Sequence, residues 1–366
     1  MYFDLNYIKI ATYVLKQIVG KTFPNPPVVS ILVESDIHYR VNKIVSFGIT
    51  SVSGRPHAEY NAINNFNFKK NKKYTLYSTL EPCCHEGRGP SCVSKIIDSK
   101  FINRVVFAAI DPDVRVNGKG KKKLIENNID VSYGYASNDI DEIYKGYFLS
   151  RKSNRPRVFL KLATSLDGHI AIKSQKIKIT NQESDFFSHL LRSKMDAILV
   201  GSNTVKVDNC LLTSRINGLE KFTPLRVILS RKLDLDNSLR IFKNCKKYKT
   251  LIFTQQKDIE KKKKFLELNV EVITLAKKDY NLQNILKKLA SIGVCNLLVE
   301  GGAKIFSLFL KEGKFDDIFI FRNNFFIGRK GFNATEFELD DLSKIKLFKK
   351  DVKKIGNDTL EILTRK

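Results

Sequence analysis

The chain has 366 residues, 43% of them hydrophobic, and a formal net charge of +26 at pH 7. This length exceeds the size at which one hydrophobic core usually keeps growing, so we expect two domains. No apolar run approaches the about 18 residues of a membrane span, and the first residues carry charges where a secretory signal would be apolar. The composition therefore argues against a membrane or secreted protein, and a soluble, cytoplasmic protein is expected.

The positive charge raises the question of nucleic acid or a membrane surface as a partner. Lysines are spread over the whole chain among Asn, Ile and Phe, which all have AT-rich codons, so genomic base composition explains much of the excess. The one dense run, Lys261 to Lys264, is typical of a solvated surface helix. We therefore predict no membrane partner and no specific nucleic-acid partner.

Short apolar runs alternate with helix-like stretches from Val28 to about Gly134, which predicts an α/β sandwich with a largely parallel sheet. Residues 148–157 then become polar and basic and include a proline, and a new strand opens at Val158. The domain boundary is placed in this segment, which we interpret as a linker. The second half repeats the alternation and again predicts an α/β layer architecture.

A candidate zinc site lies in the first half. His57 and Glu59, in the string H-A-E, precede a helical apolar spacing and would lie in the first turn of that helix. Cys83 ends a strand, and Cys92 opens another helix, so two helix N-termini would meet and favour thiolate ligands. One imidazole and two thiolates leave the fourth position of a tetrahedral zinc for water, as in catalytic sites. Zinc deaminases combine such ligands with a glutamate that moves protons.

Simpler interpretations of these residues stay open. Eight residues separate the two cysteines, which is longer than the usual short spacing, and buried free cysteines are common core residues. A histidine before a helix is also more often a cap or a surface residue. The conjunction of the three elements favours the metal. Cys84 adjoins Cys83 and should point elsewhere, and we expect His85 to contact substrate rather than metal.

The string TLEPCCHEGRGPSC, with PHAE and PNPPV before it and DPDVRVNGKG after it, resembles the deaminase half of the bifunctional riboflavin-biosynthesis deaminase/reductase family. The resemblance implies a cytidine-deaminase-like α/β/α domain over residues 1–148, with zinc held by His57, Cys83 and Cys92. It also implies that Glu59 is catalytic and carries protons to the leaving amine of a phosphorylated diaminopyrimidine riboside. Candidates for holding the ring or phosphate of that substrate are Asn25, His85, Arg88 and Lys119. Val29 departs from the family, which usually has glycine there.

Three later strings, KLATSLDGHIA, ILVGSNTVKVDNCLLTSR and LLVEGGAKIFSLFL, resemble the reductase half of the same family. They imply a dihydrofolate-reductase-like α/β domain over residues 156–366, which reduces the ribosyl side chain with NADPH. Glycines after a strand let a phosphate approach the amides of the next helix. A strand-ending turn is the alternative for E-G-G taken alone, and the lack of G-x-G-x-x-G disfavours a Rossmann domain.

Site residues of the reductase half follow from position in these strings. The resemblance places the cofactor against Thr164, Lys178, Thr204, Asp208, Gly302, Ala303, Lys304, Ile305, Phe306, Ser307 and Leu308. It places the substrate against Lys176, Arg192, Leu212, Arg215 and Glu300. Arg231 follows a strand and would favour the 2′-phosphate of NADPH, although a solvated surface arginine fits the sequence equally well. Lys176 and Lys178 replace a typical Ser-x-Trp, and Cys210 replaces a proline.

The main hypothesis is therefore a bifunctional enzyme that deaminates and then reduces small phosphorylated pyrimidines, with zinc and NADPH as cofactors. A homo-oligomer is expected. Two alternatives remain at this point. The substitutions at Val29, Lys178 and Cys210 would fit a decayed homologue with one remaining activity, and the positive charge with H-A-E would fit a nucleic-acid base deaminase.

Overall fold

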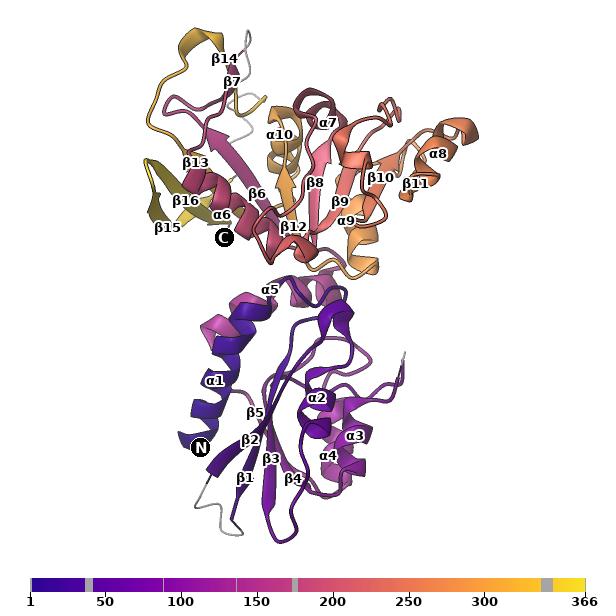
Figure 1. The fold of residues 1–366 in the computed structure, drawn as a ribbon, viewed down its shortest axis with the longest axis vertical. Helices are drawn as coiled ribbons and strands as arrows, with labels where there is room; N and C mark the ends of the chain where they lie inside the picture. Colours follow the sequence, from indigo (N-terminus) through magenta and orange to yellow (C-terminus); the bar gives the residue numbers. More distant parts are fainter. Residues whose placement is uncertain are drawn as a thin grey trace. The chain divides into compact units, whose positions relative to one another are not determined.

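The computed structural model describes residues 2–36, 42–87, 89–135, 137–172, 177–336 and 345–365. The chain divides into two compact units, Met1–Asn154 (unit 1) and Arg155–Lys366 (unit 2), each with its own sheet (Figure 1). Within the described ranges, no helix is long and apolar enough to cross a membrane.

Unit 1 is a five-stranded sheet with helices on both faces (Figure 1). Its strands are β1 (Val29–Ser35), β2 (Asn42–Ile49), β3 (Lys73–Leu80), β4 (Ile102–Ala109) and β5 (Asp130–Tyr133), in the order β2-β1-β3-β4-β5. Its helices are α1 (Tyr2–Ile18), α2 (Ala58–Asn64), α3 (Cys92–Asp98), α4 (Lys119–Glu126) and α5 (Asn138–Ser153). Helices α1 and α5 cover one face, and α2, α3 and α4 cover the other. This arrangement is the expected α/β/α sandwich.

The packing of α2 depends on a glycine. A Cβ at Gly48 of β2 would lie 2.1 Å from the carbonyl oxygen of Ala58, so a side chain there would push α2 off the sheet. The buried core beneath α2 and α3 includes Leu76, Ile96 and Phe107. The two helices whose first turns carry the metal candidates are therefore held directly on the sheet.

Two expectations for the first half need correction. The sheet is mixed rather than largely parallel, because β1 runs antiparallel to both β2 and β3 while β3, β4 and β5 are parallel. Strands buried on both faces are apolar whichever way they run, so the hydrophobic pattern predicted the strands but not their direction. Residues 148–153, expected in an irregular linker, continue α5 as far as Ser153, and that helix has Ile140 and Tyr144 fully buried.

Unit 2 has a nine-stranded sheet in the order β11-β10-β9-β8-β12-β6-β13-β16-β15. These strands are β6 (Arg157–Thr164), β8 (Ala197–Gly201), β9 (Leu225–Leu229), β10 (Thr250–Thr254), β11 (Val270–Thr274), β12 (Asn296–Glu300), β13 (Asp317–Arg322), β15 (Leu347–Ile355) and β16 (Asp358–Arg365). The helices are α6 (Gln182–Ser193), α7 (Ser202–Asp208), α8 (Ile259–Leu266), α9 (Leu282–Ser291) and α10 (Ala303–Lys311). A separate antiparallel pair joins β7 (His169–Ile172) to β14 (Gly331–Asn333).

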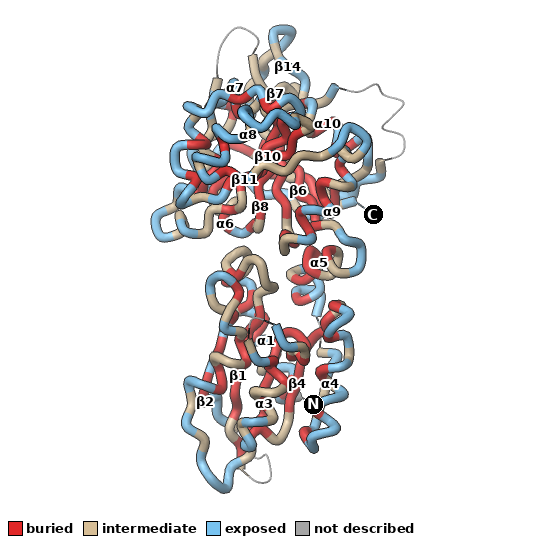
Figure 2. Tube along the Cα trace, turned by 90° about the vertical axis from the view of Figure 1, so that its right-hand side faces the viewer, coloured by how far each residue is buried: buried red, intermediate tan, exposed pale blue. Residues whose placement is uncertain are grey.

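Seven strands of the large sheet, from β11 to β13, run parallel to one another, whereas β16 pairs antiparallel with β13 and β15 pairs antiparallel with β16. Parallel strands are buried on both faces, and the central strands of unit 2 are buried accordingly (Figure 2). Because the strands are parallel, Thr164, Gly201 and Glu300 end β6, β8 and β12 at the same edge of the sheet. Chemistry in unit 2 is expected at this edge.

Candidate active sites

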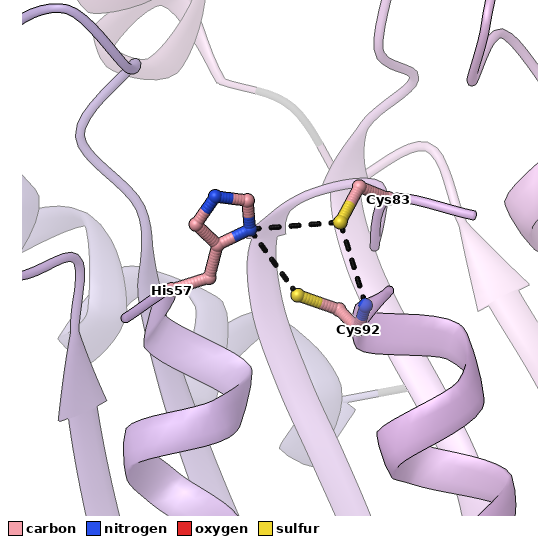
Figure 3. A group of neighbouring side chains, drawn as sticks. All are labelled: His57, Cys83 and Cys92. Carbon is pink, nitrogen blue, oxygen red and sulfur yellow. Dashed lines mark hydrogen bonds between the residues drawn. The ribbon is translucent and has the colours of Figure 1, made fainter. Parts of the chain in front are cut away.

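Three side chains of unit 1 converge on one point (Figure 3). His57 caps α2, Cys83 follows β3, and Cys92 is the first residue of α3. The Nδ1 atom of His57 lies 3.5 Å from Sγ of Cys83 and 3.3 Å from Sγ of Cys92. All three ligand atoms lie within 4.8 Å of one another.

Local structure holds the two sulfur atoms in place. The hydroxyl of Ser91 caps α3 by accepting the N–H of Ser94, which fixes the first turn of that helix. The backbone N–H of Cys92 donates to Sγ of Cys83 at 3.4 Å. A hydrogen bond from the Cys92 side chain and the nearby His57 ring lower the pKa of the Cys83 thiol well below its usual range. A thiolate is the form of cysteine that binds metal.

The donor set fits zinc. An imidazole nitrogen and two sulfurs are ligands that zinc prefers, and three protein ligands with one open position characterise a catalytic rather than a structural site. Glu59 lies beside this group but supplies no ligand to it. Its side chain is only 3% exposed, and its Oε2 accepts a hydrogen bond from Cys92 Sγ at 3.4 Å. Burial raises the pKa of Glu59 to about 7, so its carboxyl group can both take up and release a proton near neutral pH.

The residues expected to hold the deaminase substrate have different surroundings. The Nδ2 atom of Asn25 lies 3.2 Å from Nε2 of His57 and donates to the Gly54 carbonyl at 2.8 Å. Nδ1 of His85 is buried and has no hydrogen-bond partner among the described residues, which leaves it available to a ligand. Lys119 is exposed, and its Nζ donates to the Val114 carbonyl. Arg88 lies outside the described residues.

Cys84 points away from the three ligands, and its Sγ lies 3.4 Å from the carbonyl oxygen of Arg115. This supports its exclusion from the metal site.

The neighbouring Glu81 has a structural role that was not predicted from the sequence. Its carboxylate accepts the backbone N–H groups of Asp111, Gly118 and Lys121. A Cβ at Gly120 would lie 2.4 Å from the Pro82 carbonyl, so the 111–120 loop is held directly against the turn that carries Cys83.

In unit 2, two expected substrate residues form a mostly buried ion pair. Arg192 of α6 donates from Nε and Nη2 to the two carboxylate oxygens of Glu300, each at 2.7 Å. Burial alone would raise the pKa of Glu300, but the Arg192 guanidinium holds it well below its usual range. Leu212 is also buried and has a left-handed φ of 55°, whereas Arg215 is exposed.

Two groups that the sequence prediction missed border this ion pair. Lys161 of β6 interacts electrostatically with both Glu300 and Arg192, and burial lowers its pKa. His189 contacts the Thr213 carbonyl, and burial lowers its pKa to about 4. A lysine inside an otherwise apolar strand, and a histidine three positions before Arg192 on α6, were signals available in the sequence.

The expected cofactor residues are brought together only in part. Thr204 of α7 accepts the N–H of Gly302, which caps α10, at 3.2 Å. Oγ1 of Thr164 is buried without a partner among the described residues. Within the 302–308 stretch, Ala303, Phe306 and Ser307 are buried, Ile305 is half-buried, and Lys304 and Leu308 are exposed. The exposed residues are therefore the ones that a bound molecule reaches without repacking.

The remaining candidates within the described residues have exposed side chains. Lys178 forms an exposed ion pair with Asp185 at 2.7 Å. Arg231 is exposed and its guanidinium lies 5.8 Å from the ring centroid of Tyr280. Asp208 is exposed at the end of α7. Lys176 lies outside the described residues.

Comparisons with known proteins match both halves. The family described as "Cytidine and deoxycytidylate deaminase zinc-binding region" matches residues 1–109, and the family described as "RibD C-terminal domain" matches residues 156–360. Riboflavin biosynthesis protein RibD of Aquifex aeolicus is 38% identical over 364 residues, which cover 99% of this chain and 98% of that protein. The Bacillus amyloliquefaciens RibD is 34% identical and covers 88% of this chain and 85% of that protein.

Solved structures of other proteins have a similar fold over almost the whole chain. The structure of Acinetobacter baumannii RibD has a TM-score of 0.87 at 25% identity, with 99% of each chain covered. A Thermotoga maritima diaminohydroxyphosphoribosylaminopyrimidine deaminase/5-amino-6-(5-phosphoribosylamino)uracil reductase has a TM-score of 0.80 at 29% identity, covering 100% of this chain and 99% of that one.

Proposed function

Because this chain belongs to the RibD family of riboflavin-biosynthesis proteins, we propose that the two clusters described above are the sites of its two reactions. The chain is a bifunctional enzyme with a zinc-dependent deaminase and an NADPH-dependent reductase, as expected from the sequence. Neither alternative, a nucleic-acid base deaminase or a decayed homologue with one activity, is favoured. The convergence of His57, Cys83 and Cys92 beside Glu59 is the observation that carries the assignment of the deaminase site.

In the proposed deaminase site, His57, Cys83 and Cys92 hold zinc, which when bound supplies a Lewis acid that makes water nucleophilic at neutral pH. Glu59 accepts a proton at Oε2 and delivers it to the amine that leaves the ring. A carboxyl group with a pKa near 7 suits both transfers. Asn25 and His85 contact the pyrimidine ring, and Arg88 and Lys119 contact the phosphate.

In the proposed reductase site, NADPH supplies the hydride when bound, and the residues of unit 2 place it against the ribosyl carbon. Arg192 and Arg215 bind the substrate phosphate, with Glu300 fixing the orientation of the Arg192 guanidinium through two hydrogen bonds. Leu212 and Lys176 complete the substrate contacts. Gly302 and Thr204, joined by a hydrogen bond, present the amides at the start of α10 to the cofactor phosphates.

We propose as further cofactor contacts the remaining residues that were expected from the sequence. They are Thr164, Lys178, Asp208, Arg231 and residues 303–308. We assign deamination to residues 1–148 and reduction to residues 156–366. Small phosphorylated pyrimidines are the proposed substrates. A homo-oligomer, a cytoplasmic location and the absence of nucleic-acid and membrane partners stay predictions.

The direct test is to assay both half-reactions on the purified chain and to quantify its zinc. We expect about one zinc per chain, consistent with a single three-ligand site. Removing the metal with a chelator should abolish deamination, while reduction of an already deaminated substrate by NADPH continues. Loss of both reactions on chelation, without unfolding, would contradict two separate sites.

A Glu300→Gln variant tests the substrate side of the reductase. It keeps the shape of the side chain but removes the charge that orients Arg192. Because the pair is bidentate and mostly buried, we expect the KM for the deaminated substrate to rise by at least about tenfold. The KM for NADPH should change little. A larger change for NADPH than for the pyrimidine would place Glu300 in the cofactor site instead.

A further inference from the structure

Two segments of unit 1 carry the proposed deaminase substrate contacts, and the first also contacts a metal-ligand candidate, since Nδ2 of Asn25 lies 3.2 Å from Nε2 of His57. One is residues 22–29, which includes Asn25, and the other is residues 111–120, which runs into the first turn of α4 and includes Lys119. Both loops are hydrogen-bonded to the same helix, α5, which was not predicted to have a role in the site. The bonds come from two tyrosines three positions apart, Tyr144 and Tyr147, which therefore share one face of α5.

Tyr144 holds the first loop. Its side chain is fully buried, and its hydroxyl donates to the carbonyl of Pro27 at 2.9 Å. The same hydroxyl lies 2.7 Å from Oγ1 of Thr79, which accepts the backbone N–H of Val29 at 3.1 Å. The three bonds form a closed network around residues 27–29, and the buried members of such a network have no water to replace a lost partner.

Tyr147 holds the second loop. It is only 5% exposed, and its hydroxyl lies 2.9 Å and 3.1 Å from the two carboxylate oxygens of Asp111. Asp111 is the first residue of its loop, and its carboxylate also accepts the N–H of Asp113 at 2.8 Å. Removing the phenol would take from a buried carboxylate one of its hydrogen-bond donors, and the start of the loop would relax.

We propose that Tyr144 and Tyr147 are positioning residues for deamination, and that α5 fixes the two substrate loops through their hydroxyls. This inference rests on the proposed function, because it takes Asn25 and Lys119 as substrate contacts. Neither tyrosine touches a ligand of the metal site or Glu59 by any hydrogen bond found within the described residues. Their loss should therefore loosen substrate binding and leave the metal and the proton transfer in place.

The test compares Tyr144→Phe and Tyr147→Phe with Tyr77→Phe. Tyr77 is an equally buried tyrosine of unit 1 whose hydroxyl donates to Asp4 of α1 at 2.8 Å, so it controls for the loss of a buried hydroxyl without a loop contact. We expect each α5 variant to raise the KM for the diaminopyrimidine substrate about tenfold, with kcat changed by no more than about twofold. Zinc content and reduction by unit 2 should match the wild type. The Tyr77 variant should keep the wild-type KM.

Hydrogen exchange followed by mass spectrometry distinguishes the effects of the two tyrosine substitutions. Tyr144→Phe should speed exchange in residues 22–29 only, and Tyr147→Phe in residues 111–120 only, because each hydroxyl bonds to one loop. Phenylalanine keeps the ring, so the fold should survive. If one variant loses its cooperative unfolding, the other carries the test, whereas loss of zinc from a folded variant contradicts the proposal.

Two outcomes would overturn the proposal. One is a wild-type KM in the folded α5 variants, and the other is an equal rise in KM for Tyr77→Phe, which would indicate general destabilisation. Absence of deamination in the wild-type chain would instead refute the proposed function itself.

Discussion

The two sites are built on different principles. In unit 1 the metal candidates come from the first turns of two short helices and the end of one strand, and their ligand atoms gather within 4.8 Å. In unit 2 the candidates are spread along the edge where parallel strands end, and contacts such as Thr204 with Gly302 join residues almost a hundred positions apart. A single ion requires a tight cluster of a few ligand types, whereas a dinucleotide and a sugar phosphate require a long, partly exposed surface.

This difference predicts different sensitivities. Substitution of one metal-ligand candidate in unit 1 should abolish deamination. A single substitution among the spread-out candidates of unit 2, the extended site, should lower reduction only in part. The following changes test that contrast, beginning with the largest expected effect.

Cys92→Ala removes one of three metal ligands. We expect zinc to be lost and deamination to fall below detection, because two ligands do not hold a catalytic zinc. Reduction of the deaminated substrate should continue at the wild-type rate. Cys84→Ala is the matched control, since Cys84 is also buried but bonds to a carbonyl away from the site, and it should keep its zinc. Metal retained in Cys92→Ala would remove that cysteine from the ligand set.

Glu59→Gln keeps the shape of the side chain and removes its ability to carry a proton. Zinc should stay bound, while deamination should slow by about 10²- to 10⁴-fold, the usual contribution of a general acid–base group. With the diamino substrate and NADPH present, the variant should consume no NADPH. Mixing it with Asp208→Ala, which we expect to deaminate normally and to reduce slowly, should restore the full sequence, because each variant supplies the reaction that the other lacks or performs poorly. If Glu59→Gln stays folded but cannot reduce the deaminated compound, the two reactions share a site.

Arg231→Ala probes the extended site at a single exposed position. If Arg231 binds the 2′-phosphate, the preference for NADPH over NADH in kcat/KM should shrink by about tenfold, because one exposed ionic contact is lost. The rate with NADH should stay unchanged. Lys232→Ala, which removes the next cation along the chain, serves as the comparison. An unchanged preference in Arg231→Ala would mark this residue as an ordinary surface arginine.

The smallest expected effect is on stability, and it comes from the carboxyl group of Asp196. Burial raises the pKa of Asp196 to about 6, above the usual range of an aspartate, although its Oδ2 accepts the N–H groups of Cys295 and Asn296. The folded chain therefore holds this proton more tightly than the unfolded chain, and the free energy of unfolding falls as pH rises from about 4 to 6. Above the pKa of the folded state, ionisation of Asp196 lowers the free energy of unfolding no further.

An Asp196→Asn variant keeps an oxygen that accepts both N–H groups but cannot ionise. Relative to the wild type it should gain about 2 kcal/mol of stability between pH 4 and pH 7.5. Circular dichroism is a suitable probe of unfolding, because the chain has no tryptophan. A difference between variant and wild type that does not change with pH would contradict the raised pKa.

Much of the architecture was already present in the sequence. Alternating apolar runs predicted most of the strands and several helices of both units, and H-A-E with the two spaced cysteines predicted the cluster that the structure forms. These predictions succeeded because the chemical groups lie next to the apolar pattern that sets their helix or strand. Once α2 and α3 pack on the sheet, His57 and Cys92 must stand at their first turns.

Tertiary structure decided what depends on contacts between distant segments. The antiparallel direction of β1 and the C-terminal hairpin β15–β16 depend on pairing between segments, and neither was predicted. The helices α1 and α5 were also not predicted, although Ile8, Ala11 and Leu15 recur at helical spacing in α1. The contacts of Lys161 with Glu300, and of Tyr144 and Tyr147 with the two loops, were also not predicted. The role of a buried polar group depends on its bonding partner, and that partner is known only from the folded structure. The sequence determined which groups are present and on which elements they lie. Packing determined which of them meet, since burial removes water and leaves each polar atom to bond with whatever neighbour the fold provides.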